Sequence, residues 1–422
     1  MSETRAAPLS LPHRLWRRLP AGPRRRLFTG ITAALAPHPD RVAPRTAPGL
    51  VIAGEYSRAS GLGEGARVMS AALQRLGVPS LALDVAAAMW PGAPPWPGAP
   101  PEPAASPPPP QAAIPPPGAA LLLHVNPPLL PWVLLRQNRR LMRGRRVIGF
   151  WNWELETVPP FWHPAASLVH EVWVSSQFTA AAIEKFMPGR VSVVPYPLAA
   201  IPPVPSVRDR TAFGLPPEAV VVLVSFNLAS SYVRKNPLAA VAAFRAAFAG
   251  RADRLLLIKV GNSAAAPDDF REIAGAAAGC PNIRIFTDLL SGPDNHALTR
   301  AADIVLSLHR SEGFGLVPAE AMLLGKPVVA TGWSGNLQFM DEANAVLVPY
   351  RLIPARDPRG VFEAPGAVWA EPDIVAAARH LVRLADDPAA RAALGAEAAR
   401  TVRARLGTAP LERALAAIGL VQ

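Results

Sequence analysis

The chain has 422 residues, of which 50% are hydrophobic, and a formal net charge of +12. A single core stops growing at roughly 250 to 300 residues, so this length favours two domains. No apolar run reaches the roughly 18 residues that a bilayer-spanning helix needs, which excludes an integral membrane protein. Cys280 is the only cysteine, which excludes an internal disulfide and favours a reducing, cytoplasmic compartment.

The N-terminus is strongly basic, and we expect residues 1–47 to form a separate segment. Residues 1–45 contain nine arginines against two acidic residues, which is +7 of the net charge. Trp16 and Phe28 lie among the arginines, so this segment could bind an anionic surface on the inner face of the membrane. A disordered basic tail explains the composition equally well. Nucleic-acid binding is not expected, because no basic motif with interleaved aromatic residues continues into the rest of the chain.

A first Rossmann-like domain is expected over residues 48–200. Its first strand, 49–54, leads into a glycine-containing loop and a helix at 64–76, the order of a nucleotide-binding fold. Gly61 and Gly63 lie in that loop, where glycine lets the backbone approach a phosphate; ordinary turn glycines would look the same. The Gly-x-Gly-x-Gly spacing does not fit the dinucleotide fingerprint, which excludes a nicotinamide-dependent dehydrogenase.

Residues 91–118 differ from the rest of this domain, because 14 of the 28 are proline and charge is nearly absent. Proline lacks the backbone N–H that helices and central strands need. We therefore expect an extended insertion on the surface of the first domain rather than a domain boundary.

His124 stands at the carboxyl end of the next expected strand, within residues 120–127. Open α/β sheets bind their ligands at that edge. His124 therefore stands where a ligand is expected to bind. A structural histidine bonded to a neighbouring loop is the alternative.

Aromatic and acidic residues follow the strand at 145–150, in the segment W-N-W-E-L-E. Aromatic faces and carboxylates suit a sugar, because the ring stacks and the hydroxyl groups donate hydrogen bonds. Trp153 and Glu154 are therefore candidate acceptor-binding residues. Packing of the tryptophan rings between domains remains an open alternative.

A second Rossmann-like domain is expected over residues 207–395, after a proline-spaced linker, with a helical tail at 396–422. Its first strand, 220–224, leads into a loop that ends in Arg234 and Lys235, just before a helix. Two cations beside a helix start could neutralise a diphosphate, although a solvated pair is the alternative. The ligand is expected in the cleft between the two domains.

The most informative stretch, residues 311–322, reads S-E-G-F-G-L-V-P-A-E-A-M and follows a short apolar run. We interpret it as strand, loop and helix, in which Gly313 and Gly315 permit close ligand approach. The free N–H groups of the helix start favour an anion. Glu312 and Glu320 could then hold two parts of one ligand.

This pattern, followed by G-K-P-V-V-A-T, resembles the donor-binding signature of retaining glycosyltransferases of family four, among the glycosyl transferases group 1. The W-x-W-E-L segment is similar to a polysaccharide-biosynthesis subset. The resemblance covers roughly residues 48–400 and implies the GT-B fold, an α/β architecture in which two Rossmann-like domains face each other across a cleft. It implies a hexosyltransferase that uses a GDP- or UDP-sugar, with mannose as the first guess, and a polysaccharide or lipid-linked glycan acceptor.

The resemblance also implies roles for individual residues. Glu312 would face the donor sugar, Glu320 would hold the ribose, and Lys235 would hold the phosphates. Arg234 matches less well, because the family's arginine often lies several residues earlier. His124 would lie near the anomeric carbon, so His124, Glu312 and Lys235 are the expected catalytic residues. The full donor-binding set is Gly61, Gly63, Arg234, Lys235, Glu312, Gly313, Phe314, Gly315, Leu316 and Glu320.

No Asp-x-Asp motif occurs in the chain to hold a divalent cation, so we expect no metal and no cofactor. Fixed positive charge would stabilise the leaving phosphate instead. The alternative to an enzyme is a non-catalytic nucleotide-sugar-binding module with the same fold. Such a module would keep Glu320 and Lys235 but would not need Glu312 or His124.

Overall fold

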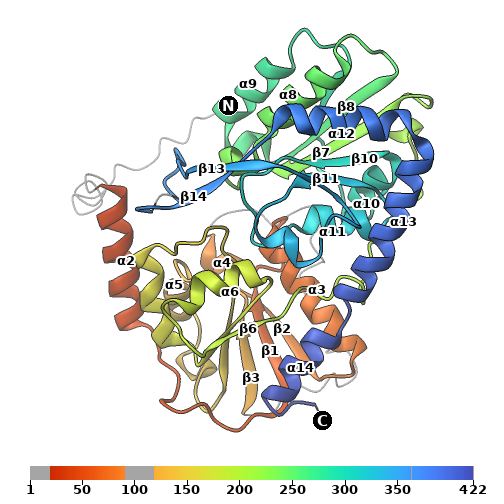
Figure 1. Cartoon of the computed structure of the whole chain (residues 1–422). Helices are drawn as coiled ribbons and strands as arrows, with labels where there is room; N and C mark the ends of the chain where they lie inside the picture. Colours follow the sequence, from red (N-terminus) through yellow and green to blue (C-terminus); the bar gives the residue numbers. More distant parts are fainter. Residues whose placement is uncertain (1–19, 91–117, 363, 422) are drawn as a thin grey trace, which may run out of the picture.

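The computed structural model describes residues 20–90, 118–362 and 364–421, and they form two lobes (Figure 1). Each lobe is built on a six-stranded parallel sheet, with strand orders β2-β1-β3-β4-β5-β6 and β12-β11-β10-β7-β8-β9. In both sheets the order reverses beside the first strand, and α/β sheets bind ligands at such switch points. The two expected Rossmann-like domains are therefore present.

The first sheet contains fully buried strands, as expected for a parallel sheet covered on both faces. Its strands are β1 (Ala47–Gly54), β2 (Ser80–Asp84), β3 (Ala119–Leu123), β4 (Val147–Trp151), β5 (Glu171–Val174) and β6 (Val191–Val193). The helices of this lobe are α3 (Gly61–Arg75), α4 (Ala86–Met89), α5 (Leu130–Leu135), α6 (Gln177–Glu184) and the 3-10 helices η1 (Arg139–Leu141) and η2 (Pro160–Leu168). The expected proline-rich insertion lies, except for Gly118, outside the described residues.

The second lobe repeats this plan and adds a separate two-stranded antiparallel hairpin. Its sheet contains β7 (Val220–Asn227), β8 (Arg254–Gly261), β9 (Ile283–Phe286), β10 (Ile304–Ser307), β11 (Val328–Thr331) and β12 (Val346–Val348), and the hairpin is β13 (Tyr350–Pro354) with β14 (Val368–Pro372). The α-helices are α7 (Tyr232–Lys235), α8 (Pro237–Phe248), α9 (Pro267–Ala277), α10 (Gly292–Ala301), α11 (Leu316–Leu323) and α12 (Ile374–Asp386), with 3-10 turns η3 (Thr211–Phe213), η4 (Ser263–Ala265) and η5 (Gly335–Gln338).

The C-terminal helices join the two lobes (Figure 1). Helix α13 (Pro388–Arg405) packs beside α11, and α14 (Ala409–Ala417) buries Leu411 and Leu415 in a cluster that contains first-lobe residues such as Leu73. The backbone N–H of Ala199 also donates to the carbonyl of Leu406 at 3.0 Å. The domain boundary that we expected between residues 395 and 396 falls inside α13, so the tail is not a separate unit.

The described part of the basic N-terminal segment is a packed helix, α2 (Ala21–Leu35), on the flank of the molecule (Figure 1). The ring of Phe28 lies 5.8 Å from that of Trp132, and Arg25 donates to the carbonyl of Arg359 at 3.0 Å. A solvated tail is therefore wrong for this part of the segment, whereas Trp16 lies outside the described residues. In the described ranges, no helix has the length and hydropathy to cross a bilayer.

The contact between α13 and α11 gives a test of the fold at Gly395. A Cβ at this position would overlap the carbonyl oxygen of Gly325, so the backbone would have to shift. We expect Gly395→Ala to lower the free energy of unfolding by about 1–3 kcal/mol, measured by urea denaturation. Gly275→Ala in α9 is the control, because nothing lies within 4 Å of its Cβ position. Alanine should stabilise that helix by about 0.5–1 kcal/mol, and equal stabilisation at both positions would contradict the packing described here.

Candidate active site

A cleft of about 640 Å³ lies between the lobes at the carboxyl ends of both sheets. The first lobe lines it with residues from the β1–α3 loop and from the ends of β3 and β4, and the second lobe with the ends of β7, β8 and β10 and the start of α11. The polar lining includes Glu55, Arg58, Ser60, Glu64, Arg67, Asn126, Asn152, Glu154, Tyr196, Ser230, Arg234, Lys235, Lys259, His296, Glu312 and Glu320. The cleft therefore holds acidic and basic groups from both lobes.

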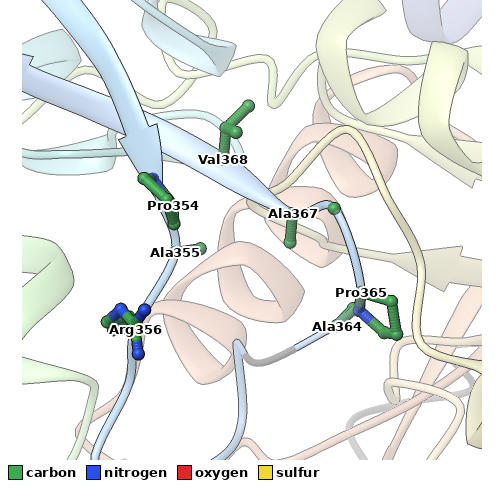
Figure 2. A pocket seen from close by; sticks show the side chains of 8 residues that line it. Pro354, Ala355, Arg356, Ala364, Pro365, Ala367 and Val368 are labelled. Carbon is green, nitrogen blue, oxygen red and sulfur yellow. The ribbon is translucent and has the colours of Figure 1, made fainter.

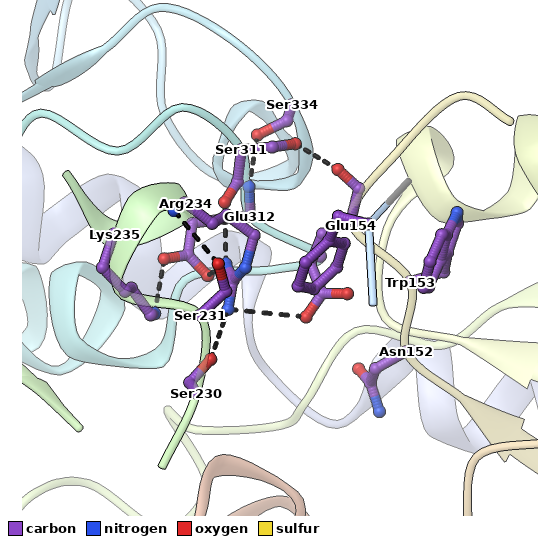
Figure 3. A network of polar contacts seen from close by, with 12 residues as sticks. Asn152, Trp153, Glu154, Ser230, Ser231, Arg234, Lys235, Ser311, Glu312 and Ser334 are labelled. Carbon is purple, nitrogen blue, oxygen red and sulfur yellow. Dashed lines mark hydrogen bonds and ion pairs between the residues drawn. The ribbon is translucent and has the colours of Figure 1, made fainter. Parts of the chain in front are cut away.

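A buried ion cluster centred on Glu312 occupies the middle of this lining (Figure 3). The Nζ atom of Lys235 lies 2.5 Å from Glu312 Oε1, and Nη1 of Arg234 lies 3.1 Å from Glu312 Oε2. From the first lobe, the carboxylate of Glu154 approaches Nη2 of Arg234 at 3.7 Å. Arg234 is only 3% exposed and Glu312 only 7%, so these charges interact with little screening by water.

The cluster sets the protonation of its two carboxylates differently. Burial alone would raise the pKa of Glu312, but Lys235 and Arg234 outweigh it and hold that pKa at about 2. Burial raises the pKa of Glu154, and the nearby charge of Glu312 adds to this rise although Arg234 opposes it. Glu312 is therefore a fixed negative charge at neutral pH.

The backbone of the α7–α8 junction explains the positions of the two cations. Ser231 caps α7 by accepting from the N–H of Arg234 at 3.3 Å, and Asn236 ends this helix in the left-handed region at φ 53°. Pro237 then begins α8 in the first turn, as expected from the sequence. Lys235 is thus the last residue of α7, at its junction with α8. Its side chain is 24% exposed and lines the cleft.

The loop before α11 is held against the first lobe. Ser176 donates to the carbonyl of Gly313 at 2.6 Å, and a Cβ on Gly313 would lie 3.1 Å from the carbonyl oxygen of Trp153. Gly315 caps α11 with φ 99°, a conformation that glycine adopts without strain. The free N–H groups of α11 therefore begin beside Phe314 and Leu316, which both line the cleft.

Glu320 lies in the same cleft but outside the ion cluster. It is half-buried, and burial together with the carboxylate of Glu64 raises its pKa to about 8. Among the described residues Glu320 forms no ion pair, whereas Glu312 pairs with both Arg234 and Lys235. The two carboxylates of the motif therefore differ in charge at neutral pH, which suits two different parts of one ligand.

The family comparison applies to the second lobe. Residues 220–369 match the family model Glycosyl transferases group 1. The match includes Arg234, Lys235, Glu312 and Glu320, so it covers the residues from which we inferred the resemblance.

The chain is also similar to curated and solved glycosyltransferases. It is 36% identical over 138 residues to the D-inositol 3-phosphate glycosyltransferase of Salinispora tropica, a match that covers 32% of this chain and 24% of that protein. The chain spans between 24% and 40% of the length of the curated relatives it matches.

Two solved structures share the fold over most of the chain. Sucrose-phosphate synthase from Thermosynechococcus elongatus superposes with a TM-score of 0.59 at 17% identity, over 88% of this chain and 98% of that one. Anabaena HepE, solved with UDP and glucose, superposes with a TM-score of 0.58 at 14% identity over the same shares. The expected GT-B fold is confirmed.

His124 lies beneath the cleft of this glycosyltransferase fold rather than in its lining. It is 0% exposed, stacks on Phe150 at 4.7 Å, and its Nε2 lies 3.0 Å from the hydroxyl of Tyr196. Burial lowers the pKa of His124 to about 4, so the ring is neutral. The structure does not support the direct substrate contact that we expected. Tyr196, the hydrogen-bond partner of His124, lines the cleft, and its hydroxyl also accepts from the side-chain amide of Asn152, another lining residue.

Trp153 does not line the cleft, and the structure does not support the acceptor contact that we expected of it. It is 2% exposed and packs against Trp162 at 4.7 Å and against Phe362 of the second lobe at 5.3 Å. Its Nε1 donates to the carbonyl of Thr157 at 3.0 Å. The alternative of packing between the lobes is what the structure shows, whereas the neighbouring Glu154 does line the cleft.

The two glycines of the first lobe differ in their roles. Gly61 is the first residue of α3 and lines the cleft, as expected. A Cβ on Gly63 would lie 2.6 Å from the carbonyl oxygen of Arg58 and 2.7 Å from that of Glu55. Gly63 is therefore required for packing of the loop on α3, and it is absent from the cleft lining.

Sequence reasoning missed several cleft residues, among them Trp90, Lys259 and His296. Trp90 is 42% exposed and its Nε1 donates to the buried Glu55 at 2.9 Å. Burial lowers the pKa of Lys259, which lies near the carboxyl end of β8 and lines the cleft. The carboxyl-edge rule could have found Lys259, but no local motif marks Trp90.

A second hollow, of about 560 Å³, lies outside this cleft at the end of the β13–β14 hairpin (Figure 2). Arg356 is its only charged lining residue among those described. The other lining residues are Pro354, Ala355, Ala364, Pro365, Gly366, Ala367 and Val368. Its mostly small and apolar lining gives it no chemistry comparable to that of the cleft.

The raised pKa of Glu320 predicts a pH-dependent stability effect. The folded state keeps this proton up to about pH 8, whereas the unfolded chain releases it near the ordinary value of 4.5, so stability falls as pH rises between the two. We expect Glu320→Gln to raise the melting temperature relative to wild type at pH 8, with no difference at pH 4. Thermal unfolding across this range is the measurement, and an effect that is independent of pH would contradict it.

Proposed function

We propose that this protein is a retaining, metal-independent glycosyltransferase of family four. It would move a hexose from a nucleoside diphosphate sugar to a polysaccharide or lipid-linked glycan. The observation that carries the proposal is the Lys235–Glu312 pair at 2.5 Å, in a cleft that also contains the start of α11 and Glu320. We place the reaction in the cytoplasm, at the inner face of the membrane.

The proposed donor fits the cleft in three parts. Its diphosphate would lie between Lys235 and the N-terminus of α11, where a cation and free N–H groups both favour an anion. The ribose hydroxyls would donate to Glu320, and the sugar hydroxyls to Glu312. Mannose from GDP-mannose is our first choice and a UDP-sugar the second. HepE, one of the similar structures, was solved with UDP and glucose.

Arg234 would act on the donor indirectly. Its Nη1 donates to the carbonyl of Ser311 at 2.7 Å and its Nη2 to the hydroxyl of Ser230 at 2.9 Å, and its side chain is only 4% exposed. We therefore assign Arg234 to positioning Glu312 and the loop before α11. Lys235, which is more exposed, is the cation that can leave Glu312 and bind the diphosphate.

The proposed reaction breaks the bond between the anomeric carbon and the phosphate oxygen and forms a bond from that carbon to an acceptor oxygen. Negative charge builds on the leaving phosphate, and positive charge builds on the sugar ring as in other glycosyl transfers. Lys235 and the start of α11 stabilise the former, and the ionised Glu312 lies near the latter. Attack from the same face lets the acceptor hydroxyl pass its proton to the leaving phosphate, which retains the configuration.

Replacing Lys235 tests this assignment. Lys235→Ala should lower kcat/KM for donor hydrolysis by about 100-fold or more, because the leaving phosphate loses its charge partner. Lys235→Arg should recover part of the rate, since the charge is kept. Lys185→Ala is the control, because Lys185 is outside the cleft lining and donates to the carbonyl of Glu156. A turnover rate of Lys235→Ala equal to that of the wild type would overturn the proposal. A wild-type protein that binds nucleotide but shows no turnover would also overturn it, because that result indicates a non-catalytic module.

A second test concerns the divalent metal. We expect turnover in the presence of EDTA to equal turnover with added Mg²⁺, once the best donor has been found by thermal-shift screening of GDP- and UDP-sugars. The physical reason is that protein cations and helix N–H groups replace the metal as partners of the diphosphate. A strict requirement for Mg²⁺ or Mn²⁺ would contradict this mechanism.

A further inference from the structure

The exposed side of α2 carries a line of large apolar side chains. Leu27, Ile31 and Leu35 are 47%, 48% and 60% exposed, and their spacing of four residues places them along one face of the helix. Past the end of the helix, Val42 is 80% exposed. The opposite side of α2 packs on the first lobe, where Thr29 and Ala33 are buried. The exposed line is therefore not needed for the helix to fold onto the protein.

A cluster of arginines lies beside this line on the first lobe. Arg136, Arg139, Arg140 and Arg143 follow α5 and are all exposed, and no ion pair joins any of them to another described residue. Their positive charges therefore face solvent. Arg26 on α2 and Arg41 and Arg45 after it are also exposed, which extends the basic surface along the helix.

Two contacts fix the arginine cluster next to α2. The guanidinium of Arg136 lies 5.0 Å from the ring centroid of Trp132, and that ring lies 5.8 Å from Phe28 of α2. At the other end, the N–H of Gly144 donates to the carboxylate of Asp40 at 3.0 Å. Asp40, which follows α2 in the chain, therefore uses its carboxylate to accept this backbone hydrogen bond.

We propose that Leu27, Ile31, Leu35, Arg136, Arg139, Arg140 and Arg143 form a docking surface for a bilayer of anionic phospholipids. The arginines would bind lipid phosphates while the three aliphatic side chains enter the headgroup layer, the usual composition of an interfacial helix. A nucleic acid would satisfy the arginines but offers no apolar layer for the aliphatic line. The inference rests on the proposed function, because docking on a bilayer would bring the enzyme to a lipid-linked acceptor in that bilayer.

The docking surface is also connected to the cleft. Arg25, the fifth residue of α2, donates to the carbonyl oxygens of Arg359 and Gly360. Arg359 in turn donates to the carbonyls of Leu228 and Ser230, at 2.9 and 2.8 Å, in the loop that leads to Arg234. A bilayer bound to α2 would therefore have a fixed orientation relative to the cleft.

The test is co-sedimentation of the full chain with vesicles of phosphatidylcholine mixed with phosphatidylglycerol, and with phosphatidylcholine alone. We expect binding to the mixed vesicles only, weakening as salt rises. Replacing Arg136, Arg139, Arg140 and Arg143 together with glutamine should lower the partition coefficient by about tenfold or more. The matched control replaces four arginines of α12, α13 and α14 that are equally exposed and have no ion pair among the described residues, Arg379, Arg383, Arg403 and Arg413. That control should bind within about twofold of wild type. Equal losses in the two variants would overturn the proposal.

The apolar half of the surface needs its own variant. Leu27→Gln, Ile31→Gln and Leu35→Gln combined should also reduce vesicle binding, whereas Val375→Gln with Val382→Gln on the exposed side of α12 should not. If the triple variant binds vesicles normally but changes the oligomeric state in sedimentation velocity, a second copy covers the line and the proposal is wrong. It is also wrong if the four arginine substitutions abolish binding of duplex DNA and leave vesicle binding intact.

Donor hydrolysis without vesicles separates this inference from the proposed function. The residues replaced in the arginine variant and in the triple aliphatic variant lie outside the cleft lining. The donor-hydrolysis rates of both variants should therefore equal that of wild type. A chain that binds vesicles as described but hydrolyses no donor overturns the glycosyltransferase proposal alone. A chain that hydrolyses a donor but does not bind anionic vesicles overturns the docking surface alone.

Discussion

The buried interaction of Glu312 with Lys235 and Arg234 is the constraint on which the cleft depends. Removing one partner from such a cluster leaves an uncompensated charge in a poorly solvated place, which typically costs about 3–5 kcal/mol. The fold therefore has to bring the α7–α8 junction, the loop before α11 and Glu154 of the first lobe to one point. In this arrangement Lys235 is already near the place where we propose that the diphosphate binds.

The same constraint explains why the lobes contact each other closely around this point. Gly313 lies against the carbonyl of Trp153, Ser176 binds the carbonyl of Gly313, and Phe362 packs on Trp153 under the guanidinium of Arg234. These contacts keep water away from Arg234 and Glu312, which strengthens their attraction. Glu320 remains outside them, where burial and the charge of Glu64 raise its pKa to about 8 and no described residue forms an ion pair with it. One fold thus gives the two motif carboxylates different electrostatic environments.

Local features of the sequence predicted the two Rossmann-like lobes, the loop before α11 and the position of Lys235, because turn glycines and helix starts depend on neighbouring residues. The sequence could not predict whether the His124 side chain points into the cleft or into the core. Strand β3, which precedes it, is buried on both faces, so its apolar run shows no alternation that distinguishes one face from the other. The two alternatives for Trp153 could not be decided from the sequence, because its partner Phe362 comes from a distant part of the chain. The composition of the N-terminal segment indicated charge and apolar residues but not that α2 packs on α5 through Phe28 and Trp132.

The central claim is that a nucleoside diphosphate sugar binds with its phosphates at Lys235 and the start of α11. A crystal structure with the donor selected by thermal-shift screening tests it most directly. We expect the diphosphate beside Lys235, the ribose on Glu320, and a distance between Lys235 Nζ and Glu312 Oε1 longer than 2.5 Å. A nucleotide bound elsewhere on the molecule, or in the cleft with its phosphates away from Lys235, would contradict the account.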